Sequence, residues 1–96
     1  MWKIGRYLRE LAEAKEKNKW ITLRTDIPLN GDEGNNFYEF TMNRKITSGL
    51  DGSYMFNDFG IDFQNETLVL RTETYDGVKE SFFIKTNNIV MIRKEN

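Results

Sequence analysis

The chain begins with a helical pattern of apolar positions. In residues 1–18, Ile4, Leu8 and Leu11 recur at spacings of four and three, and most positions between them are charged. This spacing gathers the apolar side chains on one stripe of a helix. A helix this short is marginal alone, so the sequence predicts an amphipathic helix whose stripe lies on the rest of the domain.

From Lys19 onward the pattern changes to an alternation of apolar and polar residues, which is typical of half-buried strands. The predicted strands are residues 20–27, 37–46, 66–75, 78–85 and 89–94. Between residues 47 and 65, two glycine-containing turns, 48–53 and 57–60, flank short segments rich in aromatic residues.

The last predicted hairpin has two candidate registers around Gly77. A two-residue loop places Glu73 opposite Glu80, whereas a three-residue loop, residues 75–77 with Gly77 left-handed, places Glu73 opposite Lys79. Opposite-charge cross-strand pairs contribute about 0.2 to 1 kcal/mol and like charges cost a similar amount, so we expect the three-residue loop. This register gathers four apolar side chains on one face: Leu68, Leu70, Phe82 and Ile84.

These patterns predict an α+β or mainly β fold in one domain, residues 1–96. The helix covers a strongly bent antiparallel sheet of about five to six strands, formed by residues 19–96. The expected core consists of Ile21, Leu23, Tyr38, Phe40, Met42, Leu68, Leu70, Phe82, Ile84, Ile89 and Met91, with Leu8 and Leu11 lying over it.

A helix followed by short antiparallel strands, with a tight turn before the last one, resembles the small barrels of Sm-like and SH3-like domains. The likeness rests mainly on residues 60–95, GIDFQNETLVLRTETYDGVKESFFIKTNNIVMIRKE. It implies an alternative in which the sheet closes as a barrel. Sm-like proteins bind RNA near the last turn with Asn and an Arg-Gly or Lys-His pair. This chain has Lys85, Thr86, Asn87 and Asn88 there, and neither pair is present.

Composition narrows the chemistry, because the chain contains no histidine and no cysteine. Zinc, iron and copper sites rely on imidazole or thiolate ligands, and most nucleophilic and proton-shuttling sites use the same side chains. We therefore expect no metal, no cofactor and no enzymatic activity. The absence of cysteine and of any long apolar segment favours a cytoplasmic protein, in a bacterial or phage setting.

The charges are unevenly distributed, although the net charge is only -1. Residues 1–24 contain more basic than acidic side chains, and residues 25–66 contain more acidic than basic ones. The acidic segment also contains many aromatic residues. The resulting hypothesis is a protein-binding module, either an adaptor or a phage-type inhibitor of a nucleic-acid-handling host machine, with carboxylates placed where phosphates would lie. The candidate partner-binding residues are Asp51, Tyr54, Phe56, Asp58, Phe59 and Asp62.

Two other functions stay open at this point. The first is an RNA-binding Sm-like homo-oligomer that uses basic and amide side chains from the helix and the last turn: Arg6, Arg9, Lys85, Asn87 and Asn88. The second is a carboxylate enzyme with an acid pair drawn from Asp58, Asp62 and Glu66.

Overall fold

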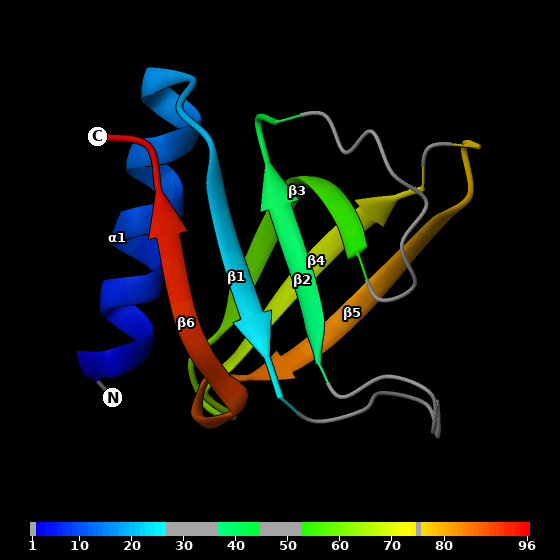
Figure 1. Cartoon of the computed structure of the whole chain (residues 1–96). Helices are drawn as coiled ribbons and strands as arrows, with labels where there is room; N and C mark the ends of the chain where they lie inside the picture. Colours follow the sequence, from blue (N-terminus) through cyan, green and yellow to red (C-terminus); the bar gives the residue numbers. More distant parts are fainter. Residues whose placement is uncertain (1, 27–36, 45–52, 75) are drawn as a thin grey trace.

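The computed structural model describes residues 2–26, 37–44, 53–74 and 76–96, with Trp2 and Lys3 described by their backbone alone. The elements in chain order are α1 (Trp2–Lys17), β1 (Ile21–Thr25), β2 (Tyr38–Met42), β3 (Ser53–Asp62), β4 (Thr67–Glu73), β5 (Lys79–Lys85), the 3-10 helix η1 (Thr86–Asn88) and β6 (Ile89–Lys94). Figure 1 shows α1 beside β6, with both chain termini on that side of the molecule. The residues of α1 are thus those for which the amphipathic pattern predicts a helix.

The strands form one mixed sheet in the order β5-β4-β3-β2-β1-β6. Neighbouring strands are antiparallel except β2 and β3, which run parallel through residues 39–41 and 53–55. The prediction of a purely antiparallel sheet is wrong at this pair, because alternation specifies the face of a side chain and not the direction of the next strand. Among the described strands the sheet is open, and the closed barrel is not confirmed.

The sheet curves toward the core. Strands about 4.8 Å apart would place β2 and β5 about 14 Å from each other in a flat sheet, since β3 and β4 lie between them. The rings of Phe40 in β2 and Phe82 in β5 nevertheless lie 5.2 Å apart, edge to face. In Figure 1, β4 and β5 accordingly run behind β1 and β2.

The core forms between this curved face and α1. Of the core residues expected from the sequence, all are buried except Met91 and Leu8, which are half-buried. A β-bulge explains Met91: Thr25 pairs with Ile89, but Arg24 pairs with Met91, so Val90 is an extra residue in β6. The bulge shifts the alternation by one, and Ile92 packs against the core in place of Met91.

A second bulge lies in β3, in the segment predicted as a turn. Residues 57–60 belong to this strand, with Phe56 opposite Thr72 and Asp58 opposite Arg71, so that Asn57 is extra. Because of this residue, Phe56 and Phe59 face the core although they are three positions apart. An extended strand with one bulge therefore replaces the predicted turn.

The hairpin between β4 and β5 has the predicted three-residue register. Glu73 pairs with Lys79, and Gly77 has a left-handed φ of 91°. The Thr74 amide donates to the Val78 carbonyl at 2.9 Å, and the Gly77 amide donates to the Thr74 carbonyl at 2.9 Å. This register is confirmed, while Tyr75 lies outside the described residues.

Helix α1 buries the stripe formed by Ile4, Tyr7, Leu11 and Ala14. It ends where Asn18 takes a left-handed φ of 54°, and the Lys19 amide donates to the Ala14 carbonyl at 2.9 Å. Within the described residues, no helix combines the length and apolarity needed to cross a membrane.

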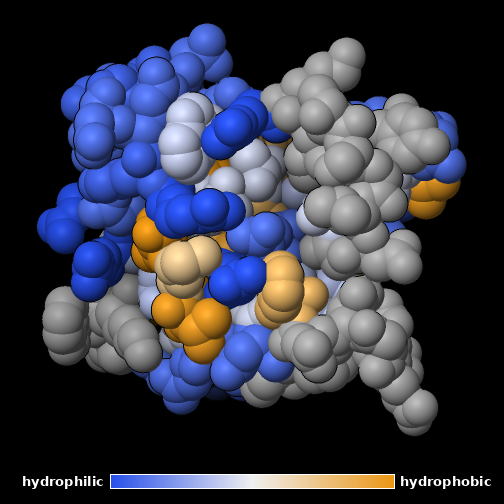
Figure 2. All heavy atoms as spheres, viewed as in Figure 1, coloured by the Kyte–Doolittle hydropathy of each residue, from blue (hydrophilic) through white to orange (hydrophobic). Residues whose placement is uncertain are grey.

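On the face viewed in Figure 1, polar side chains cover α1, and apolar side chains gather in a small area over β6, β1 and β2 (Figure 2). Two exposed apolar residues belong to these elements. Val90 lies in β6, and Phe37 directly precedes β2. The Arg24 guanidinium lies 3.7 Å from the centre of the Phe37 ring, so this ring already has a partner within the chain.

Candidate functional site

In strand β3, the acidic and the aromatic residues of the site predicted from the sequence point to opposite faces of the sheet. Tyr54 stacks on Phe40 at 5.6 Å and lies 4.7 Å from the Phe82 ring, within the core layer. Phe56 is 0% exposed, which corrects its assignment as a partner-binding residue, because a fully buried ring cannot contact another molecule. Phe59 is half-buried against the core, and Asp51 lies outside the described residues.

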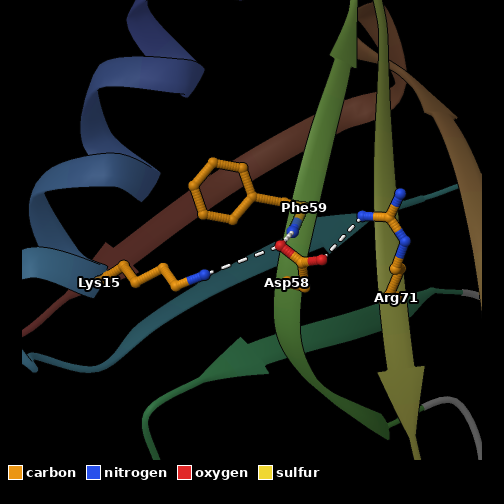
Figure 3. Close-up of polar contacts among 4 residues, drawn as sticks. All are labelled: Lys15, Asp58, Phe59 and Arg71. Carbon is orange, nitrogen blue, oxygen red and sulfur yellow. Dashed lines mark hydrogen bonds and ion pairs between the residues drawn. The ribbon is translucent and has the colours of Figure 1, made fainter.

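Asp58 contacts a cation of α1 and a cation of β4 (Figure 3). Its Oδ2 accepts a hydrogen bond of 2.9 Å from Arg71 on β4, and its Oδ1 lies 3.7 Å from the Lys15 Nζ of α1. The same Lys15 ammonium lies 5.8 Å from the centre of the Phe59 ring. Two cations thus balance this carboxylate, which weakens the acidic character predicted for the surface.

Asp62 is held by the turn that follows β3. The Asn65 side-chain amide donates to its Oδ2 at 2.8 Å, and the Asn65 backbone amide donates to its Oδ1 at 3.2 Å. These hydrogen bonds, the side-chain bond above all, hold the pKa of Asp62 below its ordinary value. A general acid at neutral pH needs a raised pKa, so the environment of Asp62 does not favour the carboxylate-enzyme hypothesis.

The strand register brings Asp58 and Asp62 onto a surface of three cross-strand rows, which we name the outer face. Leu68, Leu70, Phe82 and Ile84 point to the core, so the residues alternating with them point outward. The rows are Asp58-Arg71-Ser81, Gly60-Val69-Phe83 and Asp62-Thr67-Lys85. The middle row is apolar, and a polar row flanks it on each side, with Thr67 of the last row buried at 8% exposure.

Phe83 is the notable residue of the outer face, because its exposed fraction is 68%. No other large hydrophobic residue in the described part of the chain is more exposed. It lies opposite Val69, which is half-buried, and Gly60 continues the row without a side chain. Open space surrounds the position where a Cβ of Gly60 would be.

Phe83 is not among the site residues predicted from the sequence, although the sequence contains the signal for its exposure. The predicted hairpin register places Phe82 and Ile84 in the core, and alternation then forces Phe83 to the opposite face. A hollow of about 360 Å³ lies near the hairpin end of β4 and β5, and Phe83 does not line it. Residues that line this hollow include Asp58, Arg71, Lys79 and Ser81.

The candidate nucleic-acid residues fall into two groups. A hollow of about 310 Å³ at η1 is lined by Lys85, Asn87 and Asn88, where the Lys85 ammonium donates to the Asn65 carbonyl at 3.1 Å. Arg6 and Arg9 are exposed on α1 and do not line this hollow. The structure thus brings together three of the five residues.

In the described ranges, no group of three or more acidic side chains is placed to hold a metal ion. No protein-family model, curated protein or solved structure matches this chain.

Proposed function

We propose that this chain is a non-catalytic protein-binding module, an adaptor or an inhibitor, which recognises its partner through the outer face. The observation that carries the proposal is the exposure of Phe83, 68%, in the middle row of the outer face, at its β5 edge and between two polar rows. Aromatic side chains, Phe among them, and arginine are enriched in the cores of protein interfaces, and a polar rim surrounds these cores.

The shape of the middle row supports this proposal. Val69 beside Phe83 is half-buried, and open space surrounds the position of a Cβ at Gly60, the next residue of the row. An apolar side chain of a partner would therefore contact the Phe83 ring on one side and the Val69 side chain below. Burial of both would remove the most exposed apolar ring of the described chain from water.

The polar rows favour a partner with mixed charges over a purely basic one. Asp58 and Asp62 belong to the outer face, but Arg71 and Lys85 lie in the same rows. The proposed surface thus keeps two acidic residues predicted from the sequence and replaces the buried Phe56 by Phe83 as the aromatic anchor.

The test is affinity capture from host lysate with three baits: the wild type, Phe83→Ser, and Phe63→Ser as the matched control. Phe63 is 53% exposed and follows β3 in the turn, outside the three rows. We expect one protein that the wild type and Phe63→Ser retain and Phe83→Ser loses. Equal recovery by all three baits contradicts the proposal.

RNA binding at η1 is the second candidate function, and the hollow shared by Lys85, Asn87 and Asn88 favours it. An Sm-like protein of this kind would form a ring, which light scattering detects as a hexamer or heptamer. Its RNA affinity would fall with salt, and Lys85→Ala would weaken it. A monomer without RNA binding rules this candidate out.

A further inference from the structure

Strand β5 ends the sheet on one side, so half of its backbone groups point away from β4. Hydrogen bonds to β4 fall on even-numbered residues, since Val78 accepts from Thr74 and the Thr86 amide donates to the Glu66 carbonyl. The amides and carbonyls of the odd-numbered residues therefore point outward: Lys79, Ser81, Phe83 and Lys85.

The same four residues have exposed side chains. None of the described strands pairs with this edge of β5. An extended chain can thus approach both the free backbone groups and the side chains of the outer face without displacing any described element. Unpaired edges of this kind accept additional strands in many complexes.

We propose that β5 is a receptor strand, to which the protein partner adds an extended segment as a further antiparallel strand of the sheet. This inference rests on the proposed function, because it specifies how that partner binds. Main-chain hydrogen bonds to Ser81 and Phe83 would provide affinity, and the side chain packed on Phe83 would provide specificity.

Charge determines the chemistry of the added segment. Lys79 and Lys85 lie at the two ends of β5 on the outer face. Glu73 lies opposite Lys79, and Asp62 shares a row with Lys85, but within the described residues no carboxylate forms an ion pair with either lysine. We infer a segment with two acidic residues six positions apart, which face these lysines, and β-branched apolar residues between them, which face Ser81 and Phe83.

A second copy of this chain fits the edge less well. When two β5 strands pair in antiparallel orientation over their full length, Lys79 of each copy lies opposite Lys85 of the other. A shifted register avoids this repulsion but leaves one end of each β5 unpaired. The lysines thus oppose self-pairing and favour an acidic segment.

The experiment uses the blocked peptide Glu-Thr-Val-Thr-Val-Thr-Glu as the probe and amide hydrogen exchange as the readout. In the free protein, the Phe82 and Ile84 amides should exchange slowly, and the Ser81 and Phe83 amides should exchange quickly. Saturating probe should slow Ser81 and Phe83 selectively. A control peptide with lysine in place of both glutamates should bind about fivefold more weakly or worse, because attraction becomes repulsion at two positions.

Two variants at Ser81 separate backbone pairing from side-chain contact. Ser81→Pro removes an outward amide without removing a bond to β4, and Ser81→Ala keeps that amide. We expect Ser81→Pro to weaken probe binding at least about tenfold and Ser81→Ala to leave it within about twofold. Circular dichroism and the exchange of the Phe82 amide report whether the proline variant is folded.

The result that overturns strand addition is an unchanged exchange rate of the Ser81 and Phe83 amides in wild-type protein saturated with the captured partner. If the partner then still depends on Phe83, the proposed function stands and only the mode of binding is wrong. If the partner is indifferent to Phe83, both proposals are wrong. Pairing of β5 with a second copy, detected as protection of the same amides at high concentration without any peptide, also contradicts the acidic-segment proposal.

Discussion

Phe82 and Phe83 are consecutive residues of β5 with opposite environments: Phe82 is 6% exposed and Phe83 is 68% exposed. The Phe82 ring contacts Phe40 and Tyr54 in the core, whereas Phe83 lies on the outer face opposite Val69. The strand alternation alone produces this contrast, which makes the two residues a matched pair for separating stability from binding.

Replacement of Phe82 by alanine should lower the free energy of unfolding by about 3 to 5 kcal/mol, because it leaves a cavity against Phe40 and Tyr54. Phe83→Ala should change it by no more than about 0.5 kcal/mol, as for most exposed side chains. Urea denaturation followed by tryptophan fluorescence measures both. Equal losses for the two variants would mean that Phe83 is a structural residue.

Asp58→Asn should reduce stability only slightly, although it removes the negative charge that attracts both Lys15 and Arg71. All three side chains are more than half exposed, and exposed ion pairs of this kind contribute about 0 to 1 kcal/mol. The loss should shrink further at high salt. Urea denaturation at low and high salt checks this, and a large loss that salt does not alter would contradict it.

Asn65→Ala should raise the pKa of Asp62 toward its ordinary value, since the side-chain hydrogen bond that lowers it is removed while the backbone bond remains. A folded-state pKa below the unfolded one adds stability above the ordinary aspartate range, and this stability is lost as pH falls through the folded pKa. The difference in stability between the wild type and this variant should therefore be greatest near neutral pH and vanish in acid. An NMR titration of the Asp62 carboxyl group measures the shift, with Asn87→Ala as the control. A pKa of Asp62 that does not change would exclude Asn65 as its cause.

Gly77→Ala should destabilise the protein by about 1 to 2 kcal/mol, because residue 77 has a left-handed φ that disfavours any Cβ. Gly60→Ala is the control, since its φ is not in the left-handed region and open space surrounds the added methyl group. Its effect should stay within about 1 kcal/mol in either direction. Thermal unfolding compares the two variants, and equal effects would contradict the assigned turn.

Local patterns in the sequence predict much of this fold. The apolar spacing of Ile4, Leu8 and Leu11 predicts α1, and the charge of Glu73 and Lys79 selects the register of the last hairpin. Both depend on residues close in sequence, where periodicity and turn chemistry are reliable guides.

The alternation of apolar and polar residues in the sequence could not predict the two β-bulges. Asn57 and Val90 each insert one residue and move the following side chains to the other face. As a result, Phe56 and Phe59 both face the core, and Met91 leaves it. The predicted site was affected by the missed bulge at Asn57, because the aromatic residues near Asp58 were expected on the same surface as the acidic residues.

The central claim is that the outer face binds a protein through Phe83, and isothermal titration of the captured partner tests it most directly. The dissociation constant should rise about 30-fold or more for Phe83→Ser, as for an interface hot spot, and remain within about twofold of the wild type for Phe63→Ser. Equal affinity of the wild type and Phe83→Ser for that partner would contradict the claim.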